Sequence, residues 1–250
     1  MNSVHFNVIN FISLSPSLLD HNAWQEWASN QKRWPEPLTP VPHHLIPPMM
    51  MRRRMSTLSK LAMQTALALT EGHNVDYIVF ASRHGELTRT VKLMQDILVG
   101  EDASPIAFSQ SVHNTAAGLY TIATKQAIPV TSVGACENTL HAALIESAAY
   151  LSDNPEQKVL VVDFDEPLPA PYQEFDSSEL NAPKYHGYAL GMILSSGDGY
   201  QLAWEAGLKN KDVHESKQQY PQTLNVIANL LSDKQEWTIT APRTLWHWKR

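Results

Sequence analysis

The stretch I-P-V-T-S-V-G-A-C-E-N-T-L-H-A-A-L-I-E-S-A-A-Y-L, residues 128 to 151, decides the fold. Its β-branched beginning is typical of a short buried strand, and from Leu140 onward apolar residues recur at helical spacing. Cys136, the only cysteine among 250 residues, falls at the junction. The free N–H groups and the dipole at a helix start lower the pKa of a thiol and can hold an oxyanion, so this position suits acyl chemistry.

A strand that runs directly into a helix is a unit of α/β folds, and other segments extend that pattern. Strands are predicted at 4–13, 75–80 and 158–164, the last an apolar run of the kind buried in a central sheet. Residues 188–195 and 200–206, joined by Gly-Asp-Gly, predict a hairpin. Helices are predicted at 22–29, 51–69 (with Ser56 as N-cap), 91–98, 109–125 and 224–231, and a last strand at 237–241.

The string G-A-C-E-N-T, residues 134 to 139, is similar to the motifs around the nucleophile of β-ketoacyl synthases, where an Ala-rich helix also follows. Other segments resemble the family in matching order: residues 4–13, 51–69, 75–86 and 108–118. The resemblance implies a thiolase-like half-fold, a mixed five-stranded sheet covered by helices with a truncated second half. It also implies a ketosynthase N-terminal-type domain over 1–206 and a short helix and strand extension over 207–250.

The second half of the family's fold carries two histidines that assist decarboxylation and stabilise the resulting anion. The histidines that follow Cys136 here are His141, His186, His214 and His247, and none has the family's surroundings. Because general acid–base assistance contributes on the order of 10²- to 10⁴-fold, a thiol without it is a poor condensing catalyst. The resemblance therefore implies a chain-length factor, the non-catalytic member of a ketosynthase pair.

That role implies partners rather than cofactors. The expected partners are a full-length β-ketoacyl synthase, bound as a heterodimer, and an acyl carrier protein whose phosphopantetheine delivers the acyl groups. No cofactor is expected in the chain itself. The N-terminal half resembles proteins of aryl polyene pathways, so the expected context is polyene, polyketide or fatty-acid-like biosynthesis in the cytoplasm.

Residues 109–125 resemble the helix that packs across the two-fold axis of the family's dimers. By that resemblance, four residues line the partner's acyl tunnel: Thr115, Ala116, Leu119 and Tyr120. The polar residues His113 and Asn114 are expected to orient the interface or cap the helix. The alternative is core packing, because small Ala and Gly residues with intermittent Leu and Ile occur in any buried helix.

Two charged clusters lie outside these segments. Arg52, Arg53 and Arg54 are expected to dock an acidic acyl carrier protein, because guanidinium groups bind carboxylates and phosphates with bidentate geometry. A solvated surface is the alternative for this run. The second cluster is expected to form a salt-bridged loop at the partner interface: Arg83, His84, Glu86 and Arg89. The spacing of this second cluster lacks the His/Cys set of a metal site, so no metal is expected.

Composition argues against several classes of function. The 19 basic and 25 acidic groups give a net charge of −6, which makes a general nucleic-acid partner unexpected. One cysteine excludes internal disulfides, and no apolar run approaches the roughly 20 residues of a membrane span. Residues 1–15 lack the basic region of a signal peptide and read as a strand, so nothing in them supports export.

Two alternatives stay open at this stage. In the first, the chain is itself an acyltransferase or condensing enzyme that uses Cys136 with a base from elsewhere, such as His113. Retention of the cysteine favours this alternative, because chain-length factors often replace the nucleophile. In the second, the chain is an unrelated α/β protein in which Cys136 is a buried structural residue, the most common role of a lone intracellular cysteine.

Overall fold

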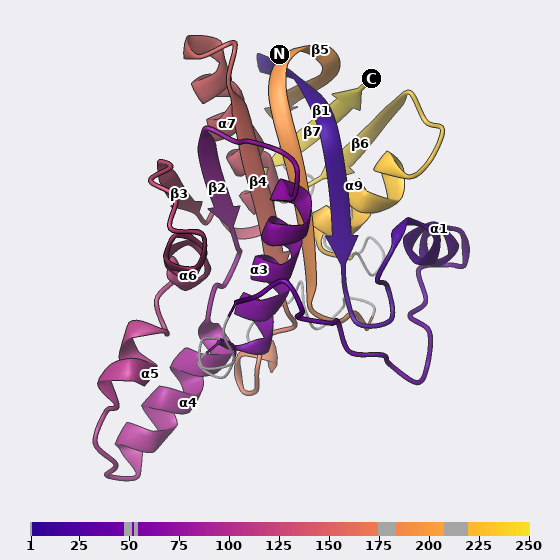
Figure 1. The fold of residues 1–250 in the computed structure, drawn as a ribbon. Helices are drawn as coiled ribbons and strands as arrows, with labels where there is room; N and C mark the ends of the chain where they lie inside the picture. Colours follow the sequence, from indigo (N-terminus) through magenta and orange to yellow (C-terminus); the bar gives the residue numbers. More distant parts are fainter. Residues whose placement is uncertain (1, 48–51, 53–54, 175–183, 208–219) are drawn as a thin grey trace.

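One mixed sheet of seven strands organises the molecule, with helices on both of its faces (Figure 1). The structure is a computed structural model that describes residues 2–47, 52, 55–174, 184–207 and 220–250. The strands are β1 (Asn2–Leu14), β2 (Tyr77–Ala81), β3 (Val130–Val133), β4 (Lys158–Asp165), β5 (Tyr188–Ala206), β6 (Glu236–Thr240) and β7 (Thr244–Lys249). The predicted mixed α/β architecture is confirmed.

The sheet has a parallel and an antiparallel part. Strands β3, β2 and β4 are parallel neighbours, so their carboxyl ends meet at one edge. β5 is antiparallel to β4, and β7 and β6 continue the sheet from β5. The predicted count of five strands is wrong, because β6 and β7 join the same sheet. Whether the residues beyond 206 are a separate folding unit stays a prediction.

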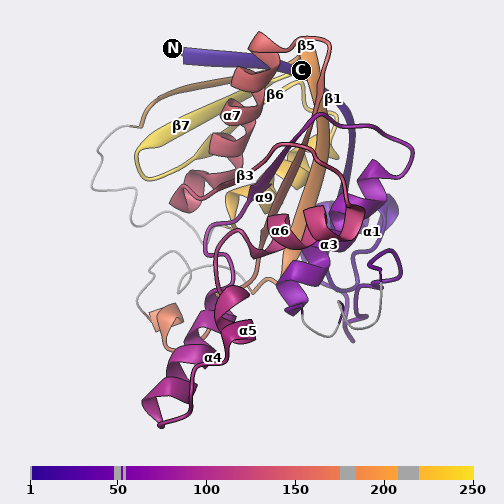
Figure 2. The same cartoon turned by 60° about the vertical axis from the view of Figure 1, so that its left-hand side comes forward.

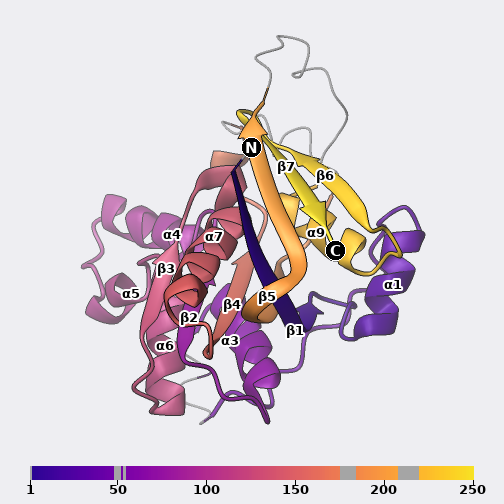
Figure 3. The ribbon, with the colours of Figure 1, turned by 90° about the horizontal axis from the view of Figure 1, so that it is seen from above.

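The predicted hairpin over 188–206 is also wrong, because these residues form the single strand β5 (Figure 3). β1 pairs with β5 in one direction throughout, from Leu14 opposite Ala189 to Asn2 opposite Trp204. Along its other edge, β5 pairs first with β4 and then with β7. A single long strand therefore connects the parallel part of the sheet to its C-terminal strands.

A bulge filled by the Asn7 side chain explains the Gly-Asp-Gly sequence within β5. The register of β1 against β5 shifts just before Asn7, where residues 196–199 leave the ladder. Asn7 Oδ1 accepts a hydrogen bond from the Gly199 N–H at 2.8 Å, and Asn7 Nδ2 donates to Ser196 O at 3.1 Å. A Cβ on Gly197 would lie 2.1 Å from Asn7 Nδ2. The glycines thus make room for a side chain rather than reverse the chain.

Helices cover both faces of the sheet. They are α1 (His21–Ser29), α3 (Thr57–Thr70), α4 (Leu87–Leu98), α5 (Pro105–Ser109), α6 (Thr115–Thr124), α7 (Thr139–Asp153) and α9 (Gln222–Leu230). α3 and α6 share one apolar core with one face, and α1, α7 and α9 share the core of the other. The predicted N-cap of α3 is confirmed, because Ser56 Oγ accepts from the Ser59 N–H at 2.8 Å. The helix predicted over 109–125 is shorter in the structure. Ser109 is the last residue of α5, and α6 begins only at Thr115.

The central strand β4 shows how the two cores form. Val159 and Val161 pack into the core under α7, while Leu160, Val162 and Phe164 pack into the core under α3. Side chains alternate between the faces of a strand, so a strand covered on both faces needs an apolar residue at nearly every position. This confirms the predicted central position of 158–164.

Helices α4 and α5 extend away from the sheet as an arm, which Figure 2 shows from the side. We call residues 87–109 the α4–α5 arm. Gly100, with φ of 89°, lies at the turn after α4. No helix in the described ranges is both long and apolar enough to span a membrane.

Candidate functional site

The carboxyl ends of the three parallel strands bring together several of the predicted residues. Cys136 follows β3, the loop of residues 82–85 follows β2, and β4 ends at Asp165. In open α/β sheets, ligands bind at the carboxyl ends of the strands. We call the region formed by Cys136, residues 82–85 and Asp165 the cysteine edge, and it is the candidate site.

Cys136 lies between β3 and α7, as predicted, and its side chain is exposed. It begins the short turn η1 (Cys136–Asn138) with φ of 51°. This left-handed conformation costs a residue other than glycine about 1–3 kcal/mol, so neighbouring contacts must hold it. Thr139 Oγ1 does so by accepting from the Ala135 N–H at 3.0 Å and donating to Cys136 O at 2.7 Å. The alternative of a buried structural cysteine is therefore wrong.

An ion pair joins two loops of the cysteine edge. Arg83 Nη2 lies 3.1 Å from Glu137 Oε1, and 15% and 33% of the two side chains are exposed. A partly exposed ion pair adds little to the free energy of folding, so its main effect is to fix position. The residue directly after Cys136 is thus tied to the loop that follows β2.

His113 packs against the same loop. Its Nε2 lies 2.7 Å from Ser82 O, and because a carbonyl oxygen only accepts, Nε2 carries a hydrogen. A Cβ on Gly85 would lie 3.0 Å from the ring, and one on Gly134 3.2 Å, so both glycines make room for the imidazole. In the described part of the chain, no hydrogen bond joins a histidine to Cys136. The neutral ring would have only Nδ1 to act as a base.

Asp165, at the end of β4, holds the loop after β2 through hydrogen bonds. Its carboxylate accepts hydrogen bonds from Ser82 Oγ at 2.8 Å, the Arg83 N–H at 2.8 Å and the His84 N–H at 3.2 Å. Burial outweighs these hydrogen bonds and raises the pKa of Asp165 to about 6. The loop that bears Arg83 is therefore held by a buried acidic group rather than by surface contacts.

A second buried carboxyl group, Asp163, lies two residues earlier on β4. Its Oδ1 accepts from Thr223 Oγ1 at 2.6 Å, and its Oδ2 has no hydrogen-bond partner within the described ranges. Burial, and then the nearby Asp165, raise the pKa of Asp163 well above its ordinary value. Burial at the end of β4 therefore raises the pKa of both carboxyl groups.

Side chains from α9 and β7 close one side of the cysteine edge. Asn138 Oδ1 accepts from Trp246 Nε1 at 2.8 Å and from Gln222 Nε2 at 3.4 Å. The His141 ring stacks on Trp246 with ring centroids 4.3 Å apart, and Trp248 Nε1 donates to His141 Nε2 at 3.1 Å. Burial lowers the pKa of His141 to about 3, so this histidine stays neutral. We call these five residues the tryptophan wall.

Sequence reasoning missed the tryptophan wall, because no strand was predicted over residues 244–249. The available signal was the pair of tryptophans at 246 and 248, whose spacing puts both side chains on one face of a strand. Their polar partners come from helices far away in the sequence, and no local pattern links them.

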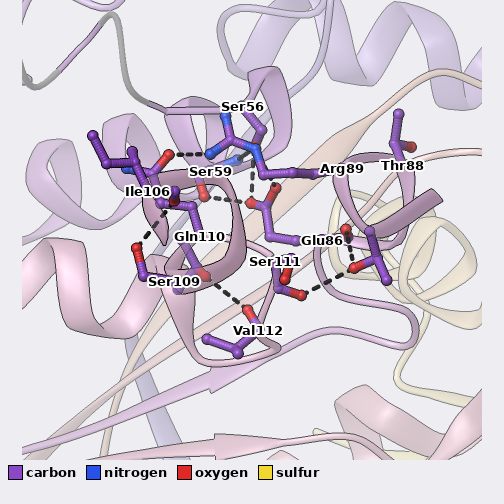
Figure 4. A network of polar contacts seen from close by, with 12 residues as sticks. Ser56, Ser59, Glu86, Thr88, Arg89, Ile106, Ser109, Gln110, Ser111 and Val112 are labelled. Atoms are coloured by element: carbon purple, nitrogen blue, oxygen red, sulfur yellow. Dashed lines mark hydrogen bonds and ion pairs between the residues drawn. The ribbon is translucent and has the colours of Figure 1, made fainter. Parts of the chain in front are cut away.

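A polar network fixes the α4–α5 arm to the body of the protein (Figure 4). Glu86 accepts from Ser56 Oγ at 2.7 Å and from Ser59 Oγ at 2.5 Å, and Arg89 Nε lies 3.9 Å from its other oxygen. Arg89 also donates to Gln110 Oε1. These contacts join α3, α4 and the segment after α5, so the base of the arm is fixed in direction. Glu86 and Arg89 are ion-paired as predicted, and their place at a partner interface stays a prediction.

The arm and its neighbours present large apolar side chains to solvent. Leu98 is 82% exposed, Val99 76% and Phe108 63%. Further exposed apolar residues lie on α4, on α5, between α5 and α6, on α6 and on the edge strand β3. Together with those three they make up what we call the apolar surface: Met94, Ile97, Ile106, Val112, Ile122 and Val130. Large exposed apolar areas of this kind mark sites of protein association.

The residues predicted to reach a partner fall into two groups. Thr115, Ala116 and Tyr120 are buried in this chain's own core, where Tyr120 Oη donates to Thr70 Oγ1 at 3.3 Å. Because α6 turns this face toward α3, these three side chains have no surface to offer a partner's tunnel, which corrects that part of the prediction. The other three remain at least partly at the surface: His113, Asn114 and Leu119.

The structure describes only one arginine of the basic run 52–54. Arg52 Nε donates to Ile46 O at 2.6 Å and Arg52 Nη2 to His44 O at 3.4 Å, so this residue holds the segment before α3. Arg53 and Arg54 lie outside the described residues, and docking of a carrier protein stays a prediction. Within the described ranges, no three His, Cys, Asp or Glu side chains are grouped to bind a metal ion.

Comparison with known proteins identifies the family. The family model for the β-ketoacyl synthase N-terminal domain matches residues 24–249. A solved structure of the ketosynthase ApeO in complex with its chain length factor ApeC, from Xenorhabdus doucetiae, contains a similar chain at 29% identity and a TM-score of 0.85. The match covers 99% of this chain and 100% of that chain. No curated protein matches the sequence.

More distant structures share the fold. The ishigamide ketosynthase/chain length factor is 15% identical with a TM-score of 0.62, and the match covers 84% of this chain and 68% of that one. A β-ketoacyl synthase from Burkholderia phymatum is 12% identical with a TM-score of 0.57, over 82% of this chain and 64% of that one. These likenesses confirm the predicted ketosynthase-type, thiolase-like fold.

Replacing Asp163 by Asn is expected to stabilise the protein at pH 7. In the unfolded chain an aspartate ionises near pH 3.9. Burial raises the pKa of Asp163 well above that value in the folded protein, so folding disfavours the ionised form of this group. This penalty is small at pH 4 and grows as the pH rises. Asp163→Asn should therefore raise the free energy of unfolding at pH 7, and by much less at pH 4.

Urea unfolding at both pH values measures the effect. Asp102→Asn, at an exposed loop position, is the control and should change little at either pH. An equal change for Asp163→Asn at pH 4 and pH 7 would show that this carboxyl group does not titrate differently in the folded protein.

Proposed function

The chain belongs to the β-ketoacyl synthase N-terminal domain family, and from that premise we propose that it is a chain-length factor. In this role it pairs with a full-length β-ketoacyl synthase in the cytoplasm and shapes the tunnel in which that enzyme extends its acyl chain. The acyl groups arrive on the phosphopantetheine of an acyl carrier protein, so the chain needs no cofactor of its own.

The apolar surface is the observation that carries the proposal. Its residues lie on the arm, on the segment between α5 and α6, on α6 and on β3, the strand at one end of the sheet. Leaving side chains such as Leu98 and Phe108 in water forfeits about 25 cal/mol per Å² of apolar area, which a partner recovers. The similarity to a chain of a ketosynthase and chain-length-factor complex, over the full length of both chains, supports the same assignment.

The surroundings of Cys136 support a subunit that does not catalyse condensation. The side of the cysteine edge formed by the C-terminal region carries the tryptophan wall, in which His141 is buried, neutral and already hydrogen-bonded. His113 has its Nε2 engaged with a backbone carbonyl. A condensing cysteine needs histidines free to assist decarboxylation, and neither of these fits that task.

A second candidate function is acyl transfer by Cys136 itself. The observation in its favour is the exposed thiol on a left-handed turn directly before α7, a geometry that presents a nucleophile to solvent. In this version His113 Nδ1 would act as the base.

Pairing through the apolar surface can be tested with Leu98→Asp. A carboxylate at the tip of the arm would be desolvated without a partner charge, so the affinity for the ketosynthase should fall at least about tenfold. Co-expression with candidate ketosynthases from the same operon, followed by size exclusion and mass measurement, reads the outcome.

The control for this experiment is Leu38→Asp, since Leu38 is 40% exposed and lies outside the apolar surface. It should pair normally. Normal pairing by Leu98→Asp would remove the arm from the interface, and a stable wild-type monomer that ignores every ketosynthase would reject the chain-length-factor assignment.

Length control is expected to depend on Phe108. This exposed ring lies on α5, shortly before His113, which packs at the cysteine edge. If Phe108 reaches the partner's tunnel, Phe108→Ala should allow longer products, because a smaller side chain leaves room for further extension. Chromatography of products from the reconstituted pair reads the distribution.

Ile122→Ala is the matched control for Phe108→Ala, because both residues are 63% exposed and belong to the apolar surface. It should keep the wild-type product length. The same product lengths from both variants and the wild type, with the heterodimer intact, would place Phe108 outside the tunnel.

Cys136→Ala separates the two candidate functions. For a chain-length factor, the complex should keep its condensing rate within a few-fold, and intact mass should show no acyl group on this chain after incubation with acylated carrier protein. Loss of the rate by about 10²-fold or more, together with an acyl adduct that Cys136→Ala removes, would favour acyl transfer by this chain instead.

A further inference from the structure

A cavity of about 350 Å³ lies beside β1, away from the cysteine edge. α1 and α3 flank it from the two faces of the sheet, and the segment 41–45 covers it. β1 is separated from β3 by β5, β4 and β2. Four strand spacings amount to about 19 Å, so a ligand here would not touch Cys136. We call this space the β1 cavity.

The walls of the β1 cavity are mainly apolar. Six large side chains provide most of them: Phe11, Ile12, Leu14, Leu19, Trp24 and Leu45. Ligand pockets in proteins typically have volumes of about 300–1,000 Å³ and combine apolar walls with a few polar groups. The β1 cavity lies at the lower end of that range, which suits a compound with one ring or a short alkyl chain.

Two buried polar side chains stand among these walls. Ser13 is 7% exposed, and its hydroxyl has no hydrogen-bond partner in the described part of the chain. Gln64 is 4% exposed, and its Oε1 accepts from the Leu45 N–H at 3.2 Å, which leaves its amide group as a donor. A buried hydroxyl without a partner costs about 1–3 kcal/mol, which a ligand's polar group would relieve.

The rim of the cavity carries negative charge. Asp20 and Glu71 are exposed lining residues, and the other exposed polar lining residues are His21 and His44. The whole chain also has a net charge of −6. A carboxylate ligand would meet like charges at the entrance, whereas an ammonium group would meet opposite charges.

We propose that the β1 cavity binds a small aromatic or alkyl compound with an uncharged or cationic polar end. The apolar body lies against Trp24 and its neighbours. A hydroxyl end pairs with Ser13 on the α1 side of β1 or with Gln64 on the α3 side, and an amine end lies near Asp20 or Glu71 on the same two sides. The site is independent of the acyl chemistry proposed for the family, so its test does not depend on the pairing experiments.

Three probes of similar size test the charge selection: 4-phenylbutanol, 4-phenylbutylamine and 4-phenylbutyrate. Titration of the full chain, alone or in its complex, is followed by calorimetry and by chemical-shift changes. The alcohol and the amine should bind, and the carboxylate should bind at least about tenfold more weakly. Equal binding of all three, or no binding of the alcohol and the amine, would overturn the proposal.

Two variants locate the bound probe. Ala68 lines the cavity from α3, so Ala68→Phe should fill it and weaken binding about tenfold or more, with Ala68→Leu as a milder version. Ser13→Ala should weaken the alcohol about three- to tenfold, the range expected for one hydrogen bond. Ala149→Phe, on the exposed side of α7, is the control and should bind normally. Unchanged binding by folded Ala68→Phe and Ala68→Leu would place the probe elsewhere and overturn the proposal.

Discussion

The pairing of β5 along both of its edges is the constraint on which the rest of the structure depends. One edge is taken by β1 along nearly the whole strand, and the other is shared by β4 and then β7. Because β7 can join only where β4 has ended, the C-terminal strands lie beyond β4 and not beside β2. This placement brings the tryptophan wall against the turn that carries Cys136. If residues 188–206 formed the predicted hairpin, β7 would not pair in this place. The tryptophan wall would then not cover the turn that carries Cys136.

The cysteine edge combines an open and a closed side. The thiol is exposed, yet the contacts around it are those of a rigid scaffold: a buried carboxylate that binds the loop after β2, an ion pair from Arg83 to Glu137, and a hydrogen bond from the Trp246 indole to Asn138. Each of these positions backbone, and none adds a base next to sulfur. These contacts fix the backbone around Cys136 rather than supply a base, which agrees with the chain-length-factor role proposed above.

Much of the fold could be predicted from sequence because the signals were local. The apolar run of β4, the Ser56 cap and the strand-turn-helix around Cys136 each depend on residues close together in the chain. The failures came from long-range contacts. Gly-Asp-Gly reads as a turn until Asn7, almost 200 residues away, is seen to fill the bulge. The buried face of α6 could not be told from its exposed face, because small and apolar residues occur on both: Ala116 and Ala117 are buried, whereas Gly118 and Ile122 are exposed.

The left-handed backbone of Cys136 has a consequence for how this sequence can change over generations. At φ of 51°, glycine or asparagine would fit the turn with less strain than any residue with a bulkier Cβ substituent. Substitution of Cys136 by glycine or asparagine is therefore expected to increase the stability of the fold. A lineage that drifts without selection on the sulfur should lose it early, so persistence of cysteine across close relatives would itself reveal a selected use for the thiol.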